Sequence, residues 1–146
     1  MASRPSIVRI VAVDLAAHMA SFYPLVFWVS YAVILLFDRE RVASQLCIGG
    51  LLATTVVGAL VVLWRVQLVR TVFADGVEAA AAVSGVGFAR GAGRILYTYT
   101  YLGQTHQGGN YVNSITRTRA LKIGDSVTLL IDRNNPTLAF IRELYL

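Results

Sequence analysis

The stretch LCIGGLLATTVVGALVVLW, residues 46–64, decides the architecture of this chain. It contains no charged residue, and its most polar members, Thr54 and Thr55, can bond their hydroxyls back to carbonyls of the same helix. At about 1.5 Å of rise per residue, such a helix nearly crosses a hydrocarbon core about 30 Å thick. Because the apolar pattern continues past Trp64, the sequence predicts a transmembrane span over about residues 46–68.

A second apolar run, LAAHMASFYPLVFWVSYAVILLF, occupies residues 15–37 and predicts the first span. Pro24 lies inside it, where it either kinks the helix or marks the first turn of a span that begins near Ser21. His18 is either a metal or haem ligand or an interfacial histidine at the headgroups. No second ligand accompanies it in the sequence, which favours the interfacial histidine.

The connection between the runs, DRERVASQ at residues 38–45, is too short to recross a bilayer. The two spans are therefore expected to form an antiparallel hairpin at residues 15–69, with both chain termini on one side. The turn carries two arginines, Arg39 and Arg41, whereas the other side carries four close to the spans. The positive-inside rule then places both termini in the cytoplasm. The four arginines are Arg4, Arg9, Arg65 and Arg70.

Residues 1–14, MASRPSIVRIVAVD, precede the first span. A signal peptide is disfavoured because Asp14 interrupts the apolar region and no A-x-A cleavage site follows. We expect a juxtamembrane segment that lies at the interface, with its arginines at the lipid headgroups.

Small residues recur every four positions in the second span, at Gly50, Thr54 and Gly58. This spacing puts them on one helix face, where they allow close approach of another helix in lipid. The neighbour is either the first span of the same chain or a helix of a partner subunit, and the motif does not distinguish the two.

Residues 70–146 are expected to form a small β domain. Residues 94–102, RILYTYTYL, alternate cleanly between two faces and give the clearest strand. Residues 77–83 are read as a preceding strand, although their four alanines favour helix. Residues 84–93 are read as a glycine-rich loop, whose glycine spacing does not match a dinucleotide fingerprint.

Further short segments complete the predicted β domain, and they indicate a small antiparallel barrel or curled sheet. The fold class is accordingly an α+β membrane protein in which a two-helix transmembrane hairpin is followed by that sheet. The segments are a turn and short strand at 103–110, a loop or short strand at 111–120, a turn at 122–125, a strand at 127–132, a tight connection at 133–136 and a last strand at 138–146.

The tyrosine row Tyr97, Tyr99 and Tyr101 has two interpretations. It forms a contact surface together with Arg117 and Arg119, including one that stacks nucleic-acid bases with charge from Arg94, Arg117 and Arg119, or it joins Ile95 as one face of a small core with hydroxyls reaching the rim. Stacking on single-stranded nucleic acid is disfavoured, because the chain from Arg70 onward has eight basic and five acidic residues, a net charge of only +3.

Composition points away from catalysis and from metal binding. The net charge of +5 suits an anionic membrane surface or an acidic partner, and Cys47 is the single cysteine, which excludes an intramolecular disulfide. One cysteine and two distant histidines do not suit structural zinc. Asp125 and Asp132 stand at turns, where Asp usually bonds the backbone, and His106 has no nearby nucleophile. We expect no enzyme activity and no cofactor.

Two motifs carry a resemblance to a family of bacterial membrane-anchored proteins of unknown function. The first is Y-x-Y-x-Y-x-G from Tyr97 to Gly103, followed by His106 and Gly108. The second is G-D-x-V-x-x-x-x-D-x-x-N-P from Gly124 to Pro136, which here has Arg133 where the family commonly has a proline. The resemblance covers roughly residues 77–141 and implies one or more spans joined to a small β domain. It implies no catalytic residue.

The function expected from these features is that of a non-enzymatic accessory or scaffolding subunit. The hairpin would sit among membrane lipids and dock in a larger complex of a bacterial inner membrane, an energy-converting complex being one such host, while the β domain contacts proteins at the surface. The alternative is a membrane-tethered module that binds or senses a peptide, a lipid headgroup or a small ligand.

Overall fold

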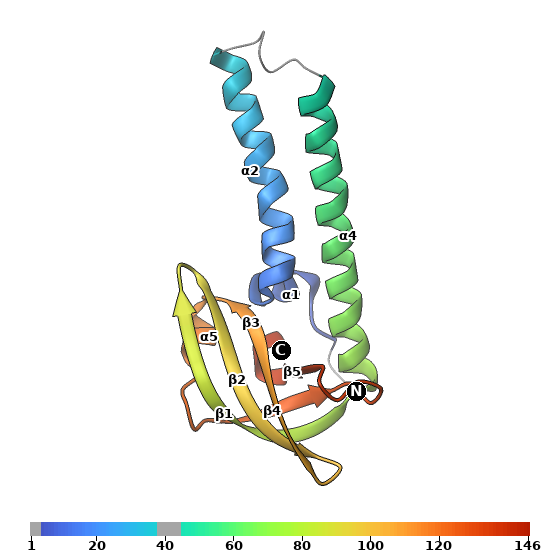
Figure 1. Cartoon of the computed structure of the whole chain (residues 1–146), viewed down its shortest axis with the longest axis vertical. Helices are drawn as coiled ribbons and strands as arrows, with labels where there is room; N and C mark the ends of the chain where they lie inside the picture. Colours follow the sequence, from blue (N-terminus) through green and yellow to red (C-terminus); the bar gives the residue numbers. More distant parts are fainter. Residues whose placement is uncertain (1–3, 38–44) are drawn as a thin grey trace.

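A computed structural model of the chain describes residues 4–37 and 45–146. Figure 1 shows two long helices that stand on a small, strongly curved sheet. The elements in chain order are α1 Ile7–Val13, α2 Leu15–Phe37, α4 Gln45–Asp75, β1 Val77–Ala89, β2 Ala92–Tyr101, β3 Gln104–Asn113, α5 Thr116–Arg119, β4 Ser126–Ile131, β5 Ala139–Ile141 and α6 Arg142–Tyr145. The predicted connection between the spans lies mostly outside the described residues.

The two long helices are antiparallel neighbours and occupy the predicted positions (Figure 1). Both are long and apolar enough to cross a membrane, and their most apolar windows are 0% and 6% buried within the molecule. Pro24 lies in the interior of α2, so it does not mark a helix start near Ser21. Thr54 and Thr55 both donate to the Leu51 carbonyl, at 2.9 and 2.8 Å, as expected.

Helix α4 continues without interruption to Asp75, well past the apolar run. Its last turns bury Val66, Val69, Val72 and Phe73 against the β domain. One helix therefore belongs to the hairpin at its first end and to the core of the β domain at its other end.

The sheet has five antiparallel strands in the order β3-β2-β1-β4-β5, and it is nearly closed. β1 connects its two halves, because its first part pairs with β4 and its later part pairs with β2. A register shift between Val83 and Gly85 marks a bulge at the changeover, and such bulges bend and twist a strand. The predicted small antiparallel barrel or curled sheet is thus present.

The glycine-rich loop predicted for residues 84–93 is wrong. β1 runs on to Ala89, and a two-residue turn at Arg90 and Gly91, both with positive φ, leads directly into β2. Two of the glycines make room for neighbouring side chains: a Cβ at Gly93 would lie 2.2 Å from Cδ1 of Phe88, and a Cβ at Gly85 would lie 3.1 Å from Cδ1 of Leu96. Close cross-strand packing explains the composition that resembled a loop.

The chain after β2 differs from the prediction in two further places. Residues 111–120 divide between the end of β3 and the short helix α5, where a loop or short strand was expected. The last strand, predicted over residues 138–146, ends at Ile141 and gives way to α6. Leu144 and Tyr145 are both buried, and burial of consecutive side chains suits a helical turn better than the alternation of a strand.

The N-terminal segment, predicted to lie at the membrane interface, also contributes side chains to the core of the β domain. Ser6 caps α1 by accepting a hydrogen bond from the backbone N–H of Arg9 at 3.2 Å, and Ile10 and Val13 are buried in the core of the β domain. Helix α1 and the C-terminus both lie at the β-domain end of the hairpin (Figure 1).

Candidate functional site

A buried carboxylate stands where the hairpin meets the β domain. Asp14 separates α1 from α2 and is 1% exposed. Its backbone N–H donates to the Ile10 carbonyl at 2.8 Å and ends α1, while its Oδ1 accepts from the backbone N–H of Ala17 at 3.0 Å and caps α2. Asp14 also forms an isolated bridge with Val112 of β3. One residue thus joins two helices and the sheet.

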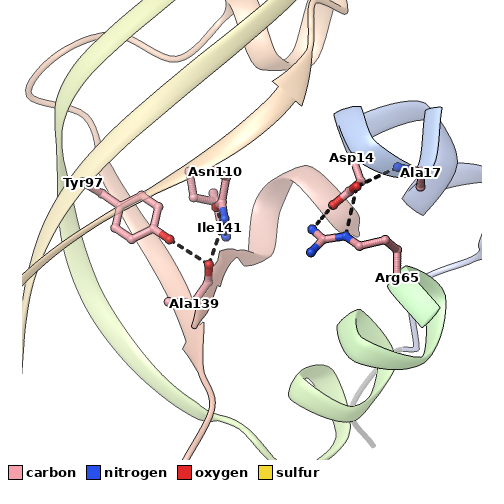
Figure 2. A network of polar contacts seen from close by, with 7 residues as sticks. All are labelled: Asp14, Ala17, Arg65, Tyr97, Asn110, Ala139 and Ile141. Carbon is pink, nitrogen blue, oxygen red and sulfur yellow. Dashed lines mark hydrogen bonds and ion pairs between the residues drawn. The ribbon is translucent and has the colours of Figure 1, made fainter. Parts of the chain in front are cut away.

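Arg65 of α4 neutralises this carboxylate. Its Nε donates to Oδ1 of Asp14 at 3.2 Å, and its Nη2 donates to Oδ2, so the guanidinium holds both oxygens (Figure 2). The guanidinium carbon also lies 5.8 Å from the centre of the Phe140 ring, within cation–π range. Arg65 therefore links α4 to both Asp14 and β5.

A cavity of about 220 Å³ lies beside this ion pair. Its walls include Asp14, Arg65, Asn110 and Tyr145. The Tyr145 ring is 1% exposed and packs edge-on against Phe140, with ring centres 5.6 Å apart. Its hydroxyl makes no hydrogen bond of regular geometry in the part of the chain that the structure describes, although the Asp14 carboxylate lies close enough to interact with it. Burial, followed by the negative charge of Asp14, raises the pKa of this hydroxyl, so it stays protonated.

Asn110 closes the sheet on the far side of the same cavity. Its side-chain Nδ2 donates to the Ala139 carbonyl at 2.9 Å, and its Oδ1 accepts from the backbone N–H of Ile141 at 3.3 Å (Figure 2). The side-chain amide of this β3 residue thus pairs with the edge of β5 as a backbone amide would. Tyr97 donates its hydroxyl to the same Ala139 carbonyl at 2.7 Å. We call Asp14, Arg65, Tyr97, Asn110 and Tyr145 the polar junction.

The side chains of the tyrosine row point toward the core that the curved sheet encloses. Tyr97 and Tyr99 are 1% and 3% exposed, and Tyr101 is half-buried against the core. The Tyr99 hydroxyl donates to the Pro136 carbonyl, and burial raises the pKa of Tyr97 and of Tyr99. The prediction that Tyr97 and Tyr99 form a contact surface is therefore wrong, because their rings face the core, as the second interpretation had it.

The two candidate surface arginines lie on α5 and are exposed. Arg117 donates to the Glu143 carbonyl at 3.4 Å, and Arg119 donates through Nε to the Ser114 hydroxyl at 2.6 Å. The structure does not bring them together with Tyr97 or Tyr99 on one surface.

The two histidines contact different aromatic rings. His18 stacks on Phe22 with ring centres 6.0 Å apart, and His106 stacks on Tyr99 at 5.4 Å. Among the described residues, no group of three or more His, Cys, Asp or Glu side chains is arranged to hold a metal ion.

The small-residue face of α4 splits into two environments. A Cβ at Gly58 would lie 2.4 Å from the Ala20 carbonyl oxygen and 2.9 Å from Cγ of Pro24, so this glycine packs directly on α2, at the edge of another open, apolar groove of about 590 Å³. A Cβ at Gly50 would meet no described atom within 4 Å. Gly50 and Thr54 instead line an open, apolar groove of about 440 Å³ between α2 and α4.

Sequence reasoning missed the polar junction, although its signal was present. Asp14 precedes the first span and Arg65 follows the second, so an antiparallel hairpin brings these two charges to the same level. Opposite charges at one level beside apolar runs are expected to pair. Comparisons of the chain with protein-family models, with curated proteins and with solved structures find no match.

Proposed function

We propose that this chain is a non-enzymatic integral membrane protein of a bacterial inner membrane that serves as an accessory or scaffolding subunit of a larger complex. The hairpin would dock against one transmembrane helix of a partner, with both termini and the β domain on the cytoplasmic side. The basic residues that flank the spans support this orientation. Family membership and the nature of the complex stay predictions.

The groove at Gly50 is the observation that carries this proposal. It is lined by apolar and small side chains of both helices and opens to the outside at the level of the predicted spans. Lipid chains fill such a surface without specificity, whereas small residues let a helix backbone approach closely. The lining residues are Phe27, Ser30, Tyr31, Ile34, Cys47, Gly50, Leu51 and Thr54.

Rigid attachment of the β domain supports a scaffolding role. The Asp14–Arg65 pair and the uninterrupted α4 fix the sheet to the hairpin. A partner helix docked in the groove would therefore set the position of the β domain relative to the complex.

Gly50→Leu tests the proposal. A leucine at this position fills the groove while leaving α2 and α4 in contact, since the glycine has open space beside it. We expect wild-type protein, extracted in mild detergent, to co-purify with a fixed set of membrane proteins and Gly50→Leu to lose them. The matched control is Leu60→Ala, an exposed position on α4 outside the groove. Purification of the wild type as a lone monomer would contradict the proposal.

A second candidate function is favoured by the unpaired Tyr145 hydroxyl beside the junction cavity. A buried donor without an acceptor is uncommon, and a small ligand with a hydrogen-bond acceptor would satisfy it. On this alternative the protein is a membrane-tethered binding module. Native mass spectrometry of the wild type and of Tyr145→Phe tests it, since only the wild type should retain a small molecule.

A further inference from the structure

A second polar pocket, separate from the polar junction, lies along the last turns of α4. It has a volume of about 280 Å³ and is lined by Arg4, Gln67, Arg70, Thr71, Ala74 and Asp75. The α4 members recur at steps of three and four residues and so share one helix face. Arg4 comes from the N-terminal segment and lines the same pocket as these residues of α4.

Arg70 is incompletely paired in this pocket. Its Nε is buried and has no hydrogen-bond partner in the part of the chain that the structure describes. A buried donor left unpaired is unfavourable, and an acceptor in the pocket would satisfy it. The Arg4 guanidinium and the Thr71 hydroxyl can also donate there, and Asp75 is the one acidic side chain in the lining. Two cations against one carboxylate favour an anionic occupant.

The depth of Arg70 relative to the spans identifies the source of that anion. From Gln45 to Arg70, α4 carries one other charged residue, Arg65, and Asp14 neutralises it. Arg70 follows Trp64 by six residues, which is about 9 Å along a helix axis. The polar layer on each side of a bilayer is roughly 5–8 Å deep, so a long arginine side chain at this position reaches the lipid phosphates.

We propose that this pocket binds the phosphate of an anionic phospholipid, with the Arg70 and Arg4 guanidinium groups as its main donors. The planar fork of arginine matches phosphate oxygens, and a surplus of cations favours anionic over zwitterionic lipids. The inference rests on the proposed insertion of the hairpin in a membrane. It is independent of whether a partner helix occupies the groove at Gly50.

Native mass spectrometry of the full chain in nonionic detergent tests this site. Phosphatidylglycerol and phosphatidylcholine are added separately, and the lipid-bound fraction is measured for each. We expect retention of phosphatidylglycerol over phosphatidylcholine, and at least about fivefold weaker retention in Arg70→Gln, the order expected from loss of one charge-assisted hydrogen bond. Arg4→Gln, in the exposed N-terminal segment, should weaken retention in the same direction, and it keeps the test valid if Arg70→Gln misfolds.

Arg90→Gln is the matched control, because it removes one positive charge at the exposed β1–β2 turn, outside the pocket. Equal retention of both lipids by the wild type, or retention unchanged in both Arg70→Gln and Arg4→Gln, overturns the proposal. So does binding of inorganic phosphate by the wild type without any preference for the lipid. Alkaline carbonate extraction of membranes checks insertion separately, and co-purification checks the subunit role. If only co-purification fails, the subunit role is contradicted and the proposed lipid site is not.

Discussion

The Asp14 carboxylate and the Arg65 guanidinium pair through two hydrogen bonds although 51 positions separate them in sequence. This pair ties the start of α2 to α4 at the point where the hairpin meets the sheet (Figure 2). Asp14 is 1% exposed and the Arg65 side chain 18%, so neither charge is well hydrated without the other.

Replacing Asp14 by Asn should destabilise the fold by about 3 kcal/mol, the lower end of the range for breaking a buried pair. Arg65 would lose its counter-charge, while the amide oxygen could still accept from Ala17. The melting temperature of the detergent-purified protein measures the effect. Glu78→Gln is the control, since Glu78 and Arg142 form a pair whose side chains are 57% and 41% exposed. Equal effects of the two variants would contradict a special role for the buried pair.

Tyr145→Phe should leave stability unchanged or raise it by about 1 kcal/mol. The hydroxyl is buried without a hydrogen bond among the described residues, so its removal relieves a desolvation cost while the ring packing remains. Tyr97→Phe is the comparison, because it removes a bond of 2.7 Å to the Ala139 carbonyl and should lower stability. Thermal unfolding of both variants distinguishes the two cases. A clear loss in Tyr145→Phe would show that its hydroxyl is satisfied in the folded protein.

Stability should fall at alkaline pH. Burial raises the pKa of Tyr97, Tyr99 and Tyr145 above the ordinary value of 10.0, so the unfolded chain releases these protons at lower pH than the folded chain does. The contribution of these three tyrosines to the free energy of unfolding has its full value below about pH 10, and it decreases as the pH rises above that value. Melting temperatures between pH 8 and 11.5 should show this decline. Tyr145→Phe should decline less steeply, and the exposed Tyr111→Phe serves as control.

Asn110→Ala should open the seam between β3 and β5. The variant loses both side-chain bonds to β5 and leaves the buried N–H of Ile141 without its acceptor, a cost of about 2 kcal/mol. Hydrogen–deuterium exchange at the Ile141 amide should become faster, with little change at the middle of β1. Gln107→Ala, at an exposed position of the same strand, is the control. Unchanged exchange at Ile141 would mean that other contacts close the sheet.

Gly58→Leu should weaken the hairpin itself. The new Cβ would lie 2.4 Å from the backbone oxygen of Ala20, so α2 must move away from α4. Gly50→Leu, on the same helix face but beside open space, should preserve the melting temperature. The two variants together separate packing within the hairpin from docking of a partner. Similar melting temperatures for both would contradict direct packing of Gly58 on α2.

Periodicity was sufficient to predict most of this fold. The apolar run at residues 15–37 gave the bounds of α2 correctly. Alternation at residues 94–102 predicted β2 and put its three tyrosines on one face, but it did not decide whether that face is buried. These signals can be read from one segment alone, because the spacing of its apolar residues reflects which of its faces is buried. The prediction of a loop at residues 84–93 failed because Gly85 and Gly93 accommodate Leu96 and Phe88 across the sheet, and composition does not reveal a cross-strand neighbour.

The polar junction was harder to predict because each of its residues has an ordinary local explanation. Asp14 looks like a break in an apolar segment. Arg65 looks like a cation whose side chain reaches the membrane interface, and Asn110 looks like a turn residue. Their joint role depends on the antiparallel hairpin and on closure of the sheet, which are long-range relationships. Tyr145 was assigned to a strand, and only the turn of α6 brings its ring under Phe140.

The uninterrupted course of α4 has a mechanical consequence. A helix of 31 residues is a rod about 46 Å long, and this one is embedded at its lower end in the core that carries the sheet. No described hinge separates its apolar part from that core. If the hairpin spans a membrane as proposed, a tilt imposed on the upper part of α4 by a thinner bilayer or by a neighbouring helix therefore rotates the sheet through the same angle.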